Sequence, residues 1–343
     1  MALSRSTWQC VAVVLFVSTT STPLAAEPVE PCPTTPPMFG SDRPTLLGVS
    51  KDSNDADPYM DINLSLQTPL FYDQFTGQDE KDCSGKFLPY FGFNYIGAFY
   101  VGTRPSGPVV GKTFNPLIRG RIFLDSSNVG QKDRPDVKFL DVEYGHLSNG
   151  QTVSSQSEFN AQAAELHSPR DAEDYISRGW DYVGATLHWY FGSPDNGQAP
   201  GVLNKYQSIS ISYRNYIGGY LQKSIEEYYP AIEPPRSITS LKQVKGFRLV
   251  DKIGTGNRFL SSVAVALETG IHRPFMYNSV RVDTELLSRY FQPRLSGFSL
   301  DLWASVGHDA NLVHYYERVS SIGLALLFET QKSDQSPSRV LTK

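Results

Sequence analysis

Apolar and polar residues alternate in short segments along most of the chain after residue 59, and this alternation limits the possible folds more than any other feature. The first segment places four apolar residues on one face and four polar residues on the other: Met60, Ile62, Leu64 and Leu66 against Asp61, Asn63, Ser65 and Gln67. A period of two residues is typical of a β-strand. The pattern returns at 208–213, 280–286 and 298–306. The sequence therefore predicts an all-β protein.

Alternating strands occur both in soluble antiparallel sandwiches and in membrane barrels. The polar face at 280–286 carries three charged residues, Arg281, Asp283 and Glu285, and the last strand, Ser321 to Phe328, ends on an aromatic residue close to the end of the sequence. The pattern yields about ten to twelve strand candidates, separated by turn-rich loops. These features favour an antiparallel transmembrane β-barrel, and a soluble sandwich is the remaining alternative.

The first 26 residues have the pattern of a secretory signal peptide. Arg5 precedes an apolar run from Val11 to Val17, and small residues lead to Ala26, where cleavage is expected. That run is far shorter than the roughly 20 residues that a membrane-spanning helix requires. No longer apolar stretch follows, so the sequence predicts an exported protein without a transmembrane helix.

The rest of the chain divides by composition. Residues 27–58 are rich in Pro, Thr, Asp and Ser and predict an extended periplasmic arm, 59–328 the barrel, and 329–343 a polar tail. Within these regions, 40–58, 75–86, 151–176 and 192–204 are expected to be loops. Cys32 and Cys83 remain after the signal peptide, either as a disulfide or as two free thiols.

The charge balance gives no support for nucleic-acid binding. The formal net charge is -4 and the sequence pI is about 5.9, whereas proteins that bind nucleic acid usually carry a positive excess. No nucleic-acid partner is expected.

One strand, 137–150, combines the alternation with residues that can perform chemistry. Its apolar face continues into a histidine and a serine: Leu140, Val142, Tyr144, His146 and Ser148. In a soluble sheet this face would be packed core, and no substrate could reach Ser148. In a membrane barrel it faces lipid, where an acyl chain is the natural neighbour.

The next strand supplies a carboxylate on the same face. Asp181 opens the strand that runs to Tyr190, and its position in the alternation matches that of the apolar residues. A carboxylate facing lipid is costly unless it has a partner. Strands joined by a loop usually pair antiparallel, so Asp181 can orient His146, and His146 can accept the proton of Ser148. His188 falls on the inward face and is not expected to be catalytic.

Two motifs carry a resemblance to the bacterial outer-membrane phospholipase A family. The first is His146-Leu147-Ser148-Asn149-Gly150, and the second is Ser177-Arg178-Gly179-Trp180-Asp181, where the family has Ser-Arg-Ser-Trp-Asn. The resemblance implies a twelve-stranded barrel of the bacterial outer membrane that hydrolyses phospholipid acyl esters. It also implies a Ser-His-Asn triad, calcium, and activation by homodimerisation.

Carried over by motif, Ser148 is the nucleophile, His146 the general base, and the Gly150 amide the oxyanion donor. Asp181 stands where the family has Asn, and a carboxylate can also accept the imidazole N–H. The resemblance further implies that calcium is bound by the Ser177 hydroxyl, the Gln151 backbone carbonyl and Ser106 from a partner subunit.

The sequence departs from the family in two places and leaves two other functions open. The connection 151–176 is much longer than the family's, and within it Val153 replaces an Asp near the family's calcium. The Gln and Trp pattern that the family carries on its early dimer-facing strand is not visible around Tyr95 to Gly102. The alternatives are a lipid A deacylase, which also displays His and Ser to lipid, and a porin or structural barrel without catalysis.

Overall fold

The structure is a computed structural model. It describes residues 45–54, 57–70, 87–100, 111–125, 137–192, 205–217, 238–255, 257, 259–272, 274, 277–287, 298–308, 312, 314, 315 and 317–328. The expected signal peptide 1–26, Cys32, Cys83, Ser106 and the polar tail 329–343 lie outside these residues.

Twelve antiparallel strands form one closed barrel in which each strand pairs with its neighbours in the sequence, and β1 also pairs with β12. The strands are β1 (Thr45–Asp52), β2 (Tyr59–Pro69), β3 (Phe87–Phe99), β4 (Thr113–Asp125), β5 (Val137–Ser148), β6 (Gly179–Gly192), β7 (Lys205–Ile217), β8 (Gly246–Thr255), β9 (Leu260–Gly270), β10 (Asn278–Leu286), β11 (Phe298–His308) and β12 (Arg318–Phe328). The predicted antiparallel barrel is confirmed, and the sandwich is excluded because a single sheet closes on itself.

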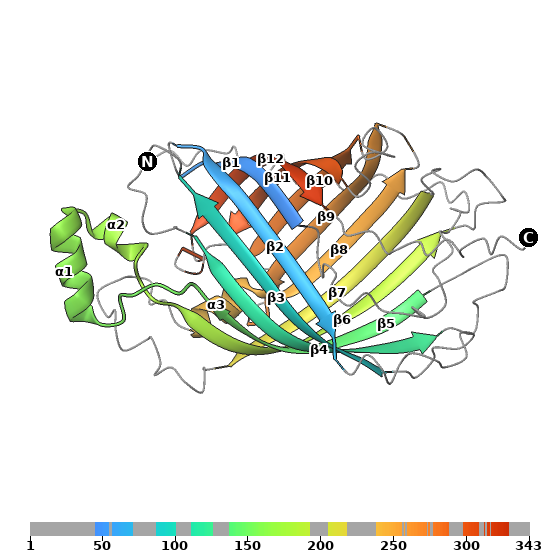
Figure 1. The fold of residues 1–343 in the computed structure, drawn as a ribbon, viewed down its shortest axis with the longest axis horizontal. Coiled ribbons are helices and arrows are strands. Elements are labelled where there is room, and N and C mark those ends of the chain that lie inside the picture. The colour runs from blue at the N-terminus through green and yellow to red at the C-terminus, as the bar shows by residue number, and fades with distance from the viewer. Residues whose placement is uncertain are drawn as a thin grey trace, which may run out of the picture.

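The described residues also contain three helices: α1 (Gln156–Leu166), α2 (Pro169–Glu173) and α3 (Ile238–Val244). Figure 1 shows α1 and α2 projecting from one end of the barrel, while α3 packs against β7 and β9. None of the helices in the described ranges is long and apolar enough to cross a membrane.

The structure corrects two expectations. Residues 45–52 of the expected arm form β1, whose register with β12 runs from Thr45 opposite Phe328 to Asp52 opposite Ser321. This pairing joins distant parts of the chain, so the local composition gave no sign of it. The expected loop 151–176 contains α1 and α2, because serines at 155 and 168 cap two helical segments.

The outer wall of the barrel is apolar. Large hydrophobic side chains that are more than one third exposed recur on alternate positions of most strands, for example Val49, Leu66, Ile118, Val142, Val183, Tyr213, Leu302 and Leu324. Their neighbours in the sequence point inward. An exposed apolar surface of this extent suits contact with lipid chains rather than with water.

The interior contains charged side chains paired with one another. On β5, Glu143 accepts hydrogen bonds from Arg119 at 2.9 Å and from Arg214 at 3.0 Å, and Asp141 accepts two from Arg121 at 2.8 and 2.9 Å. Glu143 and Asp141 are 5% and 3% exposed. These pairs connect β4, β5 and β7 along the inner wall of the barrel.

An apolar cluster fills the interior at one end of the barrel. It consists of Leu147, Trp180, Tyr182, Tyr216, Leu241, Val244, Leu312 and Tyr315, with Tyr277 packed against it. Leu241 and Val244 belong to α3, and a Cβ added at Gly270 of β9 would collide with the backbone of Gln243. The close approach of α3 to β9 therefore requires a glycine at that position.

Replacing Glu143 by alanine should lower the free energy of unfolding by about 3 kcal/mol, because the guanidinium groups of Arg119 and Arg214 would lose their shared carboxylate. Urea unfolding in detergent micelles measures the change. Val142→Ala is the matched control, since this neighbour faces outward and is 46% exposed; its effect should stay under about 1 kcal/mol. Equal losses in the two variants would contradict a stabilising role for the interior ion network.

Candidate active site

The centre of the candidate site is a histidine–aspartate pair on the outer wall. His146 of β5 lies directly opposite Asp181 of β6 in the register, and His146 Nδ1 is 2.6 Å from Asp181 Oδ1. The Asp181 side chain is 10% exposed and that of His146 is 37% exposed. A carboxylate at Nδ1 orients the imidazole ring and leaves Nε2 as the nitrogen that can accept a proton.

Ser148 lies on the same face, two residues beyond His146 and closer to the end of the barrel. It is paired with Gly179 of β6 and Phe114 of β4, and it is partly exposed. Among the hydrogen bonds of the described residues, none joins Ser148 to His146. Catalytic hydrogen bonds are often long without a substrate and shorten when one binds. The structure thus places the three predicted residues on one outer face.

Gly150 lies two residues beyond the end of β5. Its φ of +56° lies in the left-handed region, which favours glycine. A Cβ at this position would lie 3.2 Å from the ring of Phe114 and 3.9 Å from Lys112 Cε. Both the backbone conformation and the limited space therefore explain glycine at the position expected to supply the oxyanion amide.

Asn149 holds the two ends of the β5–β6 connection together. Its side chain is 2% exposed. The amide nitrogen donates to the Ile176 carbonyl at 2.7 Å, and Oδ1 accepts from the backbone N–H of Arg178 at 2.8 Å and of Gln151 at 3.3 Å. These bonds fix the backbone on both sides of Gly150. The sequence showed Asn149 only as part of the motif and gave no sign of this role.

The segments expected to bind calcium lie side by side. Val153 and Ile176 form a parallel bridge, Val153 N–H donates to the Tyr175 carbonyl at 2.9 Å, and Ser177 N–H donates to the Val153 carbonyl at 2.7 Å. The Gln151 carbonyl and the Ser177 hydroxyl therefore belong to adjacent chain segments. Both are hard oxygen donors of the kind that calcium prefers.

The α1–α2 insertion has its own small core. Val153, Phe159, Ala172 and Ile176 are buried in it, and Leu166 packs against them. Ser155 accepts a hydrogen bond from Glu158 N–H at the start of α1, and Ser168 caps α2 in the same way. The insertion is therefore a folded unit rather than a solvated loop.

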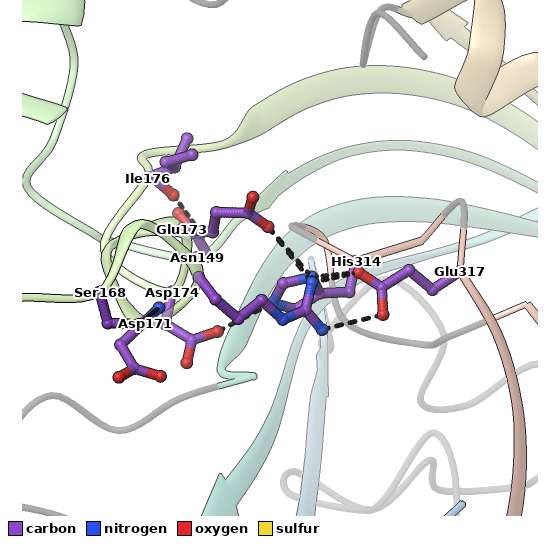
Figure 2. A network of polar contacts seen from close by, with 9 residues as sticks. Asn149, Ser168, Asp171, Glu173, Asp174, Ile176, His314 and Glu317 are labelled. Carbon is purple, nitrogen blue, oxygen red and sulfur yellow. Dashed lines mark hydrogen bonds and ion pairs between the residues drawn. The ribbon is translucent and has the colours of Figure 1, made fainter. Parts of the chain in front are cut away.

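An ion network joins this insertion to the β11–β12 connection. His314 Nε2 is 2.9 Å from Asp174 Oδ1, and Nδ1 is 3.0 Å from Glu317 Oε1. Arg170 Nη2 donates to Glu317 Oε2 at 2.9 Å, and its Nη1 lies 3.3 Å from Glu173 Oε2. Figure 2 shows these carboxylates around His314, together with the Asn149–Ile176 contact. The sequence pattern around His314 predicts no role for this residue.

The same residues resemble a metal site in one respect. Ligand atoms of Glu173, His314 and Glu317 lie within 4.8 Å of one another. However, Arg170 Nη1 is 3.3 Å from His314 Nδ1 and contacts both glutamates. The guanidinium already supplies positive charge at this point, so we interpret the group as an ion network.

His188 has the position that the alternation implied, and Arg178 of the second motif is buried. His188 points inward, where its Nε2 is 3.5 Å from Asp141 Oδ2 and its ring stacks on Phe139 at 4.3 Å. Arg178 is 1% exposed and therefore belongs to the interior of the protein.

The barrel is similar to solved structures of outer-membrane phospholipase A. The Escherichia coli protein matches with a TM-score of 0.55 at 11% identity, covering 85% of this chain and 98% of that chain. A Salmonella typhi dimer with bound calcium matches at 0.54 and 12% identity, covering 84% and 91%. No family model and no curated protein matches the sequence. At these identities the likeness shows the fold alone.

The docking of the insertion should depend on pH through His314. Burial alone lowers the pKa of its imidazole, but the hydrogen bonds to Asp174 and Glu317 outweigh burial and raise the pKa to about 9. The pKa of His314 in the folded protein exceeds its ordinary value of 6.5. The charged imidazolium therefore contributes its full stabilisation of docking below pH 6.5. This stabilisation, about 3 kcal/mol at most, is lost as the pH rises through 9.

Limited proteolysis of the insertion measures this effect. Cleavage between residues 156 and 173 should be slow at pH 6 and faster at pH 9.5, after correction for protease activity on an unstructured peptide. His314→Gln should remove the difference, because glutamine does not titrate in this range. A pH difference that persists in the variant would show that another group controls docking.

Proposed function

We propose that the protein is an outer-membrane phospholipase that hydrolyses acyl esters of glycerophospholipids. The observation that supports this most is the His146–Asp181 pair on an outer wall that is mostly apolar. Placing an ionisable pair on a lipid-facing wall is costly, and such residues usually serve a function. Ser148 two residues away completes the set that ester hydrolysis requires.

In the proposed reaction, Ser148 Oγ attacks the ester carbonyl while His146 Nε2 accepts its proton, and Asp181 stabilises the resulting imidazolium. The N–H of Gly150 donates to the oxyanion of the tetrahedral intermediate. Collapse of this intermediate releases the lysophospholipid alcohol, which takes the proton from His146. Water, activated by His146, then hydrolyses the acyl-serine to a fatty acid and restores the enzyme.

The position of the site explains how the substrate would reach it. Val142 and Tyr144 precede His146 on the outer face of β5 and are 46% and 49% exposed. An acyl chain can lie along these apolar side chains while its ester reaches Ser148 near the end of the barrel. The phospholipid would approach laterally from the membrane.

The apolar cluster at one end of the barrel argues against a porin. Leu147, Trp180 and Tyr182 lie buried there, together with Leu241 and Val244 of α3. A porin needs a continuous polar path for water through its lumen. The catalytic outer wall is therefore the function that the geometry supports best.

We include calcium and a second subunit in the proposal. The Ser177 hydroxyl and the Gln151 carbonyl would bind the ion, which supplies positive charge beside the oxyanion, and Ser106 of a second copy would add a ligand. Neither of the two described donors is a carboxylate, while Asp174 and Glu317 are engaged with His314. Because neutral oxygens bind calcium weakly, binding should depend on the second subunit.

Ser148→Ala should reduce fatty-acid release from phospholipid micelles about 10³-fold or more, because the nucleophile is lost. The control is Ser212→Ala, which removes a hydroxyl that faces inward beside Thr186. Both variants should keep the heat-modifiable electrophoretic mobility of a folded barrel. Unchanged hydrolysis in Ser148→Ala would refute the proposal, and release of acyl chains from lipid A alone would favour the deacylase.

Calcium binding should weaken about tenfold or more in Ser177→Ala, because one oxygen ligand is lost. Titration calorimetry of the detergent-solubilised protein measures the affinity independently of activity. Ser157→Ala on α1 is the control, since its hydroxyl lies 3.1 Å from the hydroxyl of Ser155 and is not among the proposed ligands. Equal affinities for all three proteins would remove Ser177 from the calcium site.

A further inference from the structure

We propose that Lys112 binds the phosphate group of the phospholipid whose ester is attacked by Ser148. This inference rests on the proposed function and extends it, because it assigns a residue that distinguishes phosphate-bearing esters from neutral ones. Neither motif in the sequence includes Lys112.

The strand register places Lys112 beside the candidate site. Phe114 of β4 lies opposite Ser148 of β5, and Lys112 precedes Phe114 by two residues, so it falls on the same outer side. A Cβ at Gly150 would lie 3.9 Å from Lys112 Cε. The ammonium nitrogen Nζ is bonded to Cε, so it also lies close to Gly150.

The order of residues along the wall matches the order of groups in a phospholipid. Towards the end of the barrel, exposed Val142 and Tyr144 are followed by His146, then Ser148, and then Gly150 with Lys112 beside it. Two residues of a strand span roughly 7 Å. When an ester carbonyl lies at Ser148 with its acyl chain along Tyr144, the glycerol carries the phosphate towards Gly150 and Lys112.

The charge of Lys112 is available for a ligand. Among the residues that the structure describes, no carboxylate forms an ion pair with Lys112, whereas Arg119, Arg121 and Arg214 all point inward and are paired. Lysine binds phosphate well as a flexible point charge. Its alkyl stem can lie along the apolar wall while the ammonium stays at the level of the lipid headgroups.

Lys51 provides a matched control. It is exposed near the end of β1 and pairs in register with Ile322, which is 57% exposed on the outer wall. Because neighbouring strands are antiparallel, β1 and β5 run in the same direction. Their last residues therefore lie at the same end of the barrel. Four strand spacings separate the two strands, roughly 19 Å along the wall. Lys51→Ala therefore removes the same charge far from Ser148.

The experiment compares hydrolysis of a diacyl phosphatidylcholine and of a diacylglycerol with the same acyl chains, in the same detergent micelles. Lys112→Ala should raise KM for the phospholipid about tenfold and leave kcat and the diacylglycerol reaction nearly unchanged. Lys112→Arg should restore the phospholipid KM, and Lys51→Ala should match the unmodified protein. Equal losses on both substrates would overturn the proposal, because Lys112 would then act through the Gly150 backbone.

A binding measurement separates this inference from the proposed function. Ser148→Ala and the double variant Ser148→Ala/Lys112→Ala are titrated with fluorescent phosphatidylcholine and diacylglycerol in micelles. A phospholipid preference that disappears without Lys112 supports the phosphate site even if no ester is hydrolysed. Equal binding of both lipids by Ser148→Ala would overturn the site even if phospholipid is hydrolysed.

Discussion

The pairing of β5 with β6 is the constraint on which the candidate site depends, because it decides which residues meet and which face they share. His146 and Asp181 are directly opposite each other and both leave the sheet on its outer side. A shift of one residue would turn one strand over and send its outer side chains into the lumen. Ion pairs inside the barrel oppose such a shift, since Glu143 connects β5 to Arg119 on β4 and to Arg214 on β7. The interior network and the outer pair are thus two consequences of one register.

Closure of the barrel determines which surfaces of the protein a substrate can reach. With β1 paired to β12, no strand edge is left among the twelve strands, so the strands can satisfy their backbone groups by pairing with one another and without water. Charged pairs and the apolar cluster then occupy the interior, and α3 closes in on β9 at the end where β9 reaches Gly270. The outer wall and the connections at that end remain accessible. In the proposed function, Ser148 on this wall would therefore meet a lipid ester directly.

The sequence was sufficient for the features that depend on the two-residue period. It predicted the barrel, the outward face of Ser148, His146 and Asp181, and the inward face of His188. It failed where contacts join distant segments. Residues 45–52 were predicted to be an extended arm because their pairing partner, β12, lies at the opposite end of the sequence. No role was predicted for His314 because its partner Asp174 is 140 residues away. The helices of the insertion were missed although Ser155 with Glu158, and Ser168 with Pro169, are ordinary helix-start signals.

The insertion shows how two parts of a site can be separated in sequence without being separated in space. Asn149 bonds to Ile176 and Arg178, and Val153 bridges to Ile176, so the connection is tied at its base before α1 begins. Once the ends are fixed, extra residues between them add little entropy cost, which grows only slowly with loop length. The small core around Phe159 and the contacts of His314 then order the added residues themselves. The backbone at Gly150 is therefore set by Asn149 rather than by the length of the connection, and the distance between the two sequence motifs places no limit on their geometry.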